Sequence, residues 1–244
     1  MKRGHPTRRL LWARDSGDMH YLGRLATPFV GVALLAASAF AWLSDAVGDH
    51  DGITAVDAPT AAWIATHRTL AEGQAGLVVA NATGPAALLA LTSLLSALLW
   101  RRGASTQALI LASGVAISYV AGGLVKLAAH RPRPTAPINL APEAEPSFPS
   151  GHVLVVSTLL GLLILLAWSR LSRAMRVAAV TTAVVAIAAV AVDRLVVGAH
   201  WITDVVGAIA LSLVIVSAAA AAYRVTEARK GTAPVAAGAT VSAG

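Results

Sequence analysis

The stretch from Asp193 to Asp204 carries three charged side chains and a histidine between two long apolar runs of the sequence. Charges beside apolar spans are costly unless they face partners or water, so such residues indicate a site. His200 and Asp204 are four residues apart, which places them on one face of a predicted helix. There the carboxylate can hold one imidazole nitrogen and leave the other free to react. The pair makes His200 a candidate nucleophile, with Arg194 close by in the sequence.

A second stretch, from Lys126 to Pro134, gathers cations in a proline-stiffened loop. A lone lysine at a helix end is more often an anchor at the membrane surface than a ligand, and that alternative applies to Lys126. Here Arg131 and Arg133 follow it. Arginine presents a planar fork that matches phosphate oxygens, and lysine acts as a point charge. The three cations together predict an anion-binding loop.

A third stretch, Pro149-Ser150-Gly151-His152, has the composition of a helix start, with proline and serine before an apolar run. Free backbone N–H groups at a helix N-terminus favour an anion, and glycine lets the backbone approach it closely. His152 then lies in the first turn, within reach of a bound anion. The sequence therefore predicts a second half of the anion site here.

The three stretches have the spacing Lys-x6-Arg-Pro, Pro-Ser-Gly-His and Arg-x5-His-x3-Asp. With these motifs the chain, over roughly residues 57 to 223, resembles the type 2 phosphatidic acid phosphatase family. The family spacing selects Arg133-Pro134 rather than Arg131-Pro132 as the end of the first motif. The resemblance implies an all-α bundle of six transmembrane helices with an extracytoplasmic active site at the helix ends. It also implies a phosphatase that needs no metal or other cofactor and forms a phosphohistidine intermediate.

The resemblance also implies roles for individual residues. His200 is similar to the family nucleophile, Asp204 to the carboxylate that orients it, and His152 to the acid that protonates the leaving oxygen. The phosphate-binding residues that it implies are Lys126, Arg133, Ser150, Gly151 and Arg194. Phosphoryl transfer needs charge stabilisation on the equatorial oxygens, which these cations and a helix N-terminus provide without a metal ion.

The chain departs from the family pattern at Asp193, where the third motif usually begins with serine. A carboxylate about 4 Å from a phosphate oxygen would repel it by about 4 kcal/mol at an effective dielectric constant near 20. We therefore expect Asp193 to turn away from the phosphate and to pair with Arg194 or another cation.

The composition is that of a membrane protein. Of 244 residues, 57% are hydrophobic and 13% charged, and the mean hydropathy is +0.70. Soluble domains carry about 25% charged residues. The absence of cysteine excludes disulfides, thiolate metal sites and a cysteine nucleophile. Six apolar runs match the length of a bilayer span, and they cover about residues 25–43, 77–100, 106–125, 151–168, 177–192 and 202–223.

The six runs define a membrane domain over residues 25–223, with a cytoplasmic N-terminal tail over 1–24 and a cytoplasmic C-terminal tail over 224–244. A cleaved signal peptide is the competing interpretation of the first run, but its core exceeds the usual 7–15 residues. The second run is expected to be irregular near Gly84-Pro85. In the third, Gly114, Ser118 and Gly122 recur every four residues, which favours close helix packing. Asp57 could cap a short helix that lies along the interface, and an ordered surface loop is the alternative for this segment.

The basic residues predict the orientation. Fourteen of the 19 Lys and Arg residues fall in the two tails and in the loops after the second and fourth runs. The other side of the membrane holds Arg68, Lys126, Arg131, Arg133 and Arg194. Positive residues concentrate on the cytoplasmic side, so both termini are predicted to be cytoplasmic and all three motifs to face outward from the cell membrane.

The net charge of +7 is spread over short clusters between apolar runs, which indicates membrane orientation and no nucleic-acid partner. The predicted substrate is the terminal phosphate of a lipid phosphate or polyprenyl pyrophosphate. Phosphatidic acid, phosphatidylglycerophosphate and undecaprenyl pyrophosphate all present that group and stay open. Two alternatives are a non-catalytic lipid-phosphate binding or transport protein and a vanadate-dependent haloperoxidase, which would resemble a soluble helical body.

Overall fold

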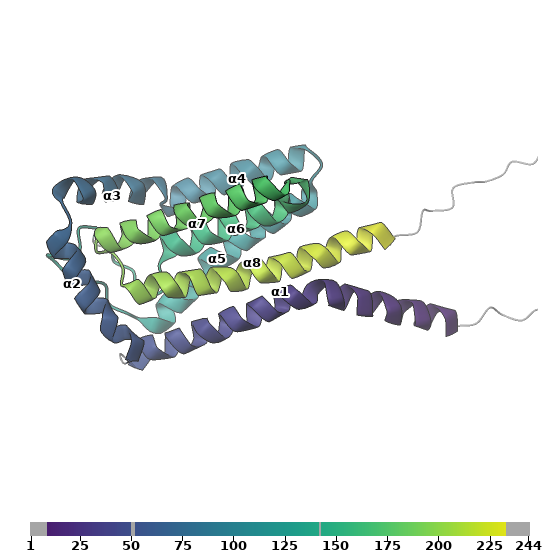
Figure 1. The fold of residues 1–244 in the computed structure, drawn as a ribbon, viewed down its shortest axis with the longest axis horizontal. Helices are drawn as coiled ribbons and strands as arrows, with labels where there is room; N and C mark the ends of the chain where they lie inside the picture. Colours follow the sequence, from purple (N-terminus) through teal and green to yellow (C-terminus); the bar gives the residue numbers. More distant parts are fainter. Residues whose placement is uncertain (1–8, 50–51, 142, 233–244) are drawn as a thin grey trace, which may run out of the picture.

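The computed structural model describes residues 9–49, 52–141 and 143–232, and these form helices and connecting loops (Figure 1). Two short 3-10 helices, η1 (Gly52–Val56) and η2 (Trp168–Arg170), lie between longer α-helices. The α-helices are α1 (Arg9–Asp49), α2 (Asp57–His67), α3 (Leu70–Ala82), α4 (Pro85–Arg101), α5 (Ser105–Ala129), α6 (Gly151–Ala167), α7 (Arg173–Val196) and α8 (Ile202–Thr232). The predicted all-α class is confirmed.

Five stretches of the described residues are single helices long and apolar enough to span a membrane, and the bent pair α3–α4 makes a sixth. The pair bends by 42° where α3 ends and α4 begins. Pro85 stands at the first turn of α4, where its missing N–H is harmless, although it would break a continuous helix. The predicted irregularity at Gly84-Pro85 is thus confirmed.

The helical ends differ from the predicted tails. Helix α1 begins at Arg9, so residues 9–24 continue the first spanning helix, and residues 1–8 lie outside the described residues. Helix α8 likewise continues past the predicted boundary at residue 223 to Thr232.

Helix α6 lies at the centre of the bundle and packs against α5, α7 and α8, while α1 runs beside α8 (Figure 1). Close approach of α5 to α6 depends on small residues, as predicted. A Cβ added to Gly114 would lie 2.5 Å from a methyl carbon of Leu162, and one at Gly122 would lie 2.8 Å from Leu154. Because larger side chains would separate the helices, this packing confirms the role of the small-residue repeat.

The outer faces of the spanning helices are apolar. Leu35 on α1, Leu94 on α4 and Val185 on α7 are more than half exposed in the isolated chain. Contiguous exposed apolar surface of this kind belongs in a lipid environment. The chain is an integral membrane protein.

Helix α2 lies across one end of the bundle, between the end of α1 and the start of α3 (Figure 1). The expected short helix is present, but the predicted capping role of Asp57 is wrong. Val56 holds the N-cap position without a side-chain cap, and Asp57 is the first helical residue. Its carboxylate is buried and bonds to Arg131 and Thr203, because a desolvated carboxylate gains more from a guanidinium than from a helix end.

Candidate active site

The three motifs meet at the end of the bundle that α2 covers, where α5 and α7 end and α6 and α8 begin (Figure 1). A cavity of about 250 Å³ lies there, lined by at least one residue from each motif. Its polar lining residues include Lys126, Glu143, Glu145, His152 and His200. Residues far apart in the sequence therefore share one enclosed space beside the membrane spans.

His200 does not lie on a helical face, contrary to the prediction. It sits in the turn between α7 and α8, where Gly198 adopts a φ of +69°. A Cβ at Gly198 would lie 2.2 Å from the carbonyl oxygen of Ile138, so the turn requires glycine. Asp204 stands in the first turn of α8, and its carboxylate reaches back to His200 across the helix start.

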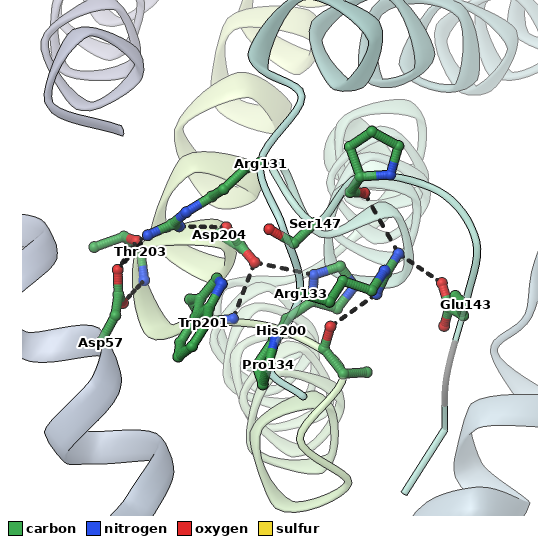
Figure 2. Close-up of polar contacts among 12 residues, drawn as sticks. Asp57, Arg131, Arg133, Pro134, Glu143, Ser147, His200, Trp201, Thr203 and Asp204 are labelled. Atoms are coloured by element: carbon green, nitrogen blue, oxygen red, sulfur yellow. Dashed lines mark hydrogen bonds and ion pairs between the residues drawn. The ribbon is translucent and has the colours of Figure 1, made fainter. Parts of the chain in front are cut away.

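The Asp204 carboxylate fixes the imidazole of His200. Oδ2 of Asp204 lies 3.2 Å from Nδ1 of His200 and also accepts the backbone N–H of Trp201 at 2.9 Å (Figure 2). On the other side of the ring, Nε2 lies 3.2 Å from a guanidinium nitrogen of Arg133. A carboxylate accepts and a guanidinium only donates, so these partners assign the proton to Nδ1 and a lone pair to Nε2.

His200 is 1% exposed, and burial lowers its pKa below the ordinary histidine value. The hydrogen bond and the charge of Asp204 oppose that shift, whereas Arg133 and Lys126 add to it. The effect of burial is the larger one, because the imidazolium loses more hydration free energy than it gains from its interaction with one carboxylate. His200 is thus neutral at pH 7, the form in which Nε2 can attack.

Arg133, rather than Arg131, lies beside His200, in agreement with the choice made from the motif spacing. Its guanidinium also donates to the carbonyl of Ala199 at 2.8 Å and to that of Glu145 at 2.7 Å. A carboxylate oxygen of Glu143 lies 2.7 Å from its remaining nitrogen (Figure 2). Arg133 is therefore held rigidly next to the lone pair of Nε2.

Lys126 lies in the last turn of α5, and its side chain is mostly buried. Its Nζ donates to the carbonyl of Pro146 and lies 3.7 Å from a carboxylate oxygen of Glu145. The loop before α6 thus places a carboxylate on each of two cations, Glu145 on Lys126 and Glu143 on Arg133. A phosphate that binds these cations has to displace or share both contacts.

The start of α6 contributes backbone and side-chain groups to the site. Ser150 occupies the N-cap position, as predicted, but its hydroxyl caps nothing and has no hydrogen-bond partner among the described residues. Its backbone N–H donates to the carbonyl of Asp204 at 3.1 Å. A Cβ added to Gly151 would meet no atom within 4 Å, so space for a ligand is open there. His152 lines the cavity, with Nε2 3.2 Å from the carbonyl of Ala80.

Arg194 is fully buried in the last turn of α7 and lines an adjacent hollow that also contains His152 and Glu143. Its Nε donates to Asp193 at 2.9 Å, and a second nitrogen bonds the same carboxylate oxygen. The expected pairing of Asp193 with Arg194 is thus confirmed. Of the predicted phosphate-binding residues, Lys126 and Gly151 line the cavity and Arg133 contacts His200, whereas Ser150 does not line it and Arg194 lines the adjacent hollow.

Sequence reasoning missed the contacts of three residues at this site. Arg131 donates to Asp204 and to Asp57, and Thr203 bonds both Arg131 and Asp57 (Figure 2). Arg131 belongs to the stretch from Lys126 to Pro134, but the sequence did not indicate which residues it contacts. Asp57 is 74 residues from Arg131 and 146 from Thr203, so no local spacing could have connected them. No group of three or more His, Cys, Asp or Glu that could hold a metal ion occurs among the described residues.

A family model described as the PAP2 superfamily matches residues 107–228, the half of the chain that contains all three motifs. The chain belongs to the PAP2 superfamily. The resemblance that the motifs of this PAP2 protein indicated is therefore confirmed.

The fold of this PAP2 protein is similar to the crystal structure of the first transmembrane PAP2 type phosphatidylglycerolphosphate phosphatase from Bacillus subtilis. The two share 19% sequence identity, with a TM-score of 0.68 over 82% of this chain and 96% of that chain. Comparison with curated proteins gave no match. The shared fold confirms the membrane helix bundle.

Proposed function

We propose that the protein hydrolyses the terminal phosphate of a membrane lipid phosphate or polyprenyl pyrophosphate, without a metal ion, through a phosphohistidine at His200. The observation that carries the proposal is the placement of His200. Asp204 holds its Nδ1, and Nε2 faces Arg133 beside a cavity that Lys126 and His152 also line. A histidine so held is a competent nucleophile toward phosphorus.

In the first proposed step, Nε2 of His200 bonds to phosphorus while the bond from phosphorus to the leaving oxygen breaks. His152 gives its proton to that oxygen, and Asp204 stabilises the positive imidazole ring that forms. In the second step, water attacks phosphorus, the P–N bond breaks, and His152 takes the proton of the water. Each step places a proton donor or acceptor on the oxygen that enters or leaves.

The phosphate itself is proposed to bind between the cations and the start of α6. Arg133 and Lys126 contact its oxygens from the loop side in place of Glu143 and Glu145, with Arg194 on the far margin. The free backbone N–H groups at Gly151 and the unpartnered Ser150 hydroxyl complete the cradle. Preorganised positive charge of this kind stabilises the equatorial oxygens in the transition state.

The position of the cavity supports a lipid substrate. Beside its polar end it is lined by apolar residues of three spanning helices, among them Leu88, Leu154 and Val155. An amphiphile can therefore place its phosphate at the cations while its chain stays in the membrane. The structural relative is titled a phosphatidylglycerolphosphate phosphatase, which makes phosphatidylglycerophosphate the first substrate to assay.

Purified protein in detergent with excess EDTA should release inorganic phosphate from at least one of three lipids: phosphatidic acid, phosphatidylglycerophosphate or undecaprenyl pyrophosphate. The expected result follows from cations that provide the charge stabilisation a metal would otherwise supply. Phosphate release is measured at equal detergent-to-lipid ratio for all three. A strict requirement for added magnesium would contradict the proposed cradle, and no release from any of the three would contradict the substrate class.

We further propose that both termini are cytoplasmic and that the active site faces outward from the cell membrane. The 14-to-5 division of basic residues supports this orientation. The loop between α4 and α5, with Arg101 and Arg102, lies at the opposite end of the bundle from α2 (Figure 1).

The orientation can be tested by cysteine labelling, because the native chain has no cysteine. The exposed residues His67 and Arg102 are each replaced by cysteine in otherwise native protein. A membrane-impermeant maleimide should label His67→Cys in intact cells and Arg102→Cys only after permeabilisation. The cysteine-free protein is the unlabelled control, and the reverse pattern would refute the orientation.

A further inference from the structure

Both oxygens of the Asp204 carboxylate are engaged, and they face different partners. Oδ2 accepts from His200 and from the backbone of Trp201, whereas Oδ1 accepts from a guanidinium nitrogen of Arg131 (Figure 2). Asp204 is 0% exposed, so no water competes for these contacts. The direction in which Oδ2 points at the imidazole is therefore fixed from the other side by Arg131.

Arg131 is itself buried and anchored to the start of α8. The nitrogen that binds Asp204 also donates to the Thr203 hydroxyl at 2.7 Å, and the Trp201 ring lies 5.8 Å from the guanidinium carbon. Its second nitrogen donates to the carboxylate of Asp57. A guanidinium with three directed hydrogen bonds, made by two of its nitrogens, cannot rotate without breaking at least one of them.

Asp57 closes the network from α2. It accepts the backbone N–H of Thr203 at 3.0 Å and the Thr203 hydroxyl at 2.6 Å, in addition to the guanidinium of Arg131. One buried carboxylate thus ties α2, the loop after α5 and the first turn of α8 together. Figure 2 shows the resulting line of contacts from Asp57 through Arg131 and Asp204 to His200.

The charges of this line bear on the chemistry. Arg131 alone would neutralise Asp204 and weaken its attraction for a positive imidazole. Asp57 supplies a second negative charge, so two carboxylates, one guanidinium and a neutral His200 carry a net charge of −1. Phosphoryl transfer to Nε2 makes the ring positive, and the group then becomes neutral. The net negative charge of this group is compensated only when the imidazole ring becomes positive. It therefore stabilises the transition state more than the resting state.

We propose that Arg131 and Asp57 form a positioning pair that orients Asp204 and keeps it effective as the negative partner of His200. Neither residue lines the cavity that holds Lys126, His152 and His200. Both act through Asp204, so the pair should govern kcat and not KM. The inference rests on the proposed function, since it needs His200 to be the nucleophile.

The pair can be tested through the pH profile of kcat/KM on the lipid that the wild type hydrolyses. The acid limb reports protonation of His200, whose lowered pKa places that limb below the ordinary histidine value of about 6.5. Activity is retained above the lowered pKa and lost as the pH falls through it. Other charged or titratable groups that contact His200 or line its cavity are unchanged in the variants, and they are Asp204, Arg133, Tyr119, Lys126, His152, Glu143 and Glu145.

Asp57→Asn removes a negative charge and Arg131→Gln a positive one. We expect kcat to fall by about 10- to 100-fold in both, with KM within about twofold of wild type, because misorientation affects the chemical step. The acid limb should move in opposite directions, to lower pH in Asp57→Asn and to higher pH in Arg131→Gln, by about half a unit or more. Arg131→Lys keeps the charge without the fork, so kcat should fall while the limb stays in place.

Asp49→Asn is the matched control, since Asp49 is an exposed carboxylate at the end of α1 on the same side of the bundle. It should change neither kcat nor the acid limb. Melting temperature and gel filtration in detergent establish that each variant is folded. The double variant Asp57→Asn with Arg131→Gln should restore the acid limb of the wild type while kcat stays low. If folded single variants shift the limb in the same direction, or not at all, the pair is structural only. If the wild type releases no phosphate or His200→Ala stays active, the proposed function fails instead.

Discussion

Purified His200→Ala protein should release less than about one hundredth of the phosphate that the wild type releases from the same lipid. A nucleophile has no substitute within the site, and the methyl side chain of alanine cannot form the P–N bond. The variant should remain folded, because among the described residues the side-chain polar contacts of the imidazole are those with Asp204 and Arg133. Phosphate release and melting temperature are measured on the same preparation.

The same assignment predicts a trapped intermediate. Quenching the active enzyme in alkaline denaturant during turnover of a radiolabelled phosphate substrate should leave acid-labile, base-stable label on His200. His67→Ala is the matched control, since His67 is an exposed histidine on α2, outside the cavity, and should retain both label and activity. Residual turnover above about one hundredth in folded His200→Ala would remove His200 from the role of nucleophile.

His152→Ala should lower the rate on a lipid phosphate monoester by about 10² to 10⁴, the usual range for general acid catalysis. His152 lines the same cavity as His200, at the start of α6, where it can reach the leaving oxygen. A simple alkoxide is a poor leaving group and needs the proton, whereas p-nitrophenolate leaves readily without one. The loss on p-nitrophenyl phosphate should therefore be clearly smaller than the loss on the lipid.

Comparison of the two histidine variants isolates the proton transfer. His200→Ala should lose both activities alike, because both substrates require the nucleophile. Single-turnover rates on each substrate provide the measurement, so that product release does not mask chemistry. Equal losses for His152→Ala on the lipid and on p-nitrophenyl phosphate would show that His152 positions phosphate and donates no proton.

Several features followed from the sequence because their causes are local. Apolar runs long enough to span a bilayer can be recognised in the sequence alone, because a spanning helix is identified by its length and composition and not by its contacts. The small residues Gly114 and Gly122 predicted close helix packing for the same reason, and the structure shows that α6 is the helix they pack against. The spacing from Lys126 selected Arg133, and the structure places that residue beside His200. Electrostatic repulsion predicted that Asp193 pairs with Arg194 or another cation, and the structure shows the contact with Arg194.

Other features depended on contacts between residues far apart in the chain. His200 lies in a turn and not on a helical face, because Gly198 packs against the carbonyl of Ile138 in another loop. The local pattern could only extend the helix, since spacing contains no information about a loop that arrives from 60 residues away.

The sequence by itself determined the membrane bundle, the family and the residues available for chemistry, because motif order and hydropathy are properties of the linear chain. Only the tertiary structure decided how those residues are paired. It placed Asp57 on Arg131 and Arg131 on Asp204, and it set Glu143 on the cation beside His200. A buried charge takes whichever opposite charge the fold brings within reach, and that partner is chosen by helix packing and not by sequence distance.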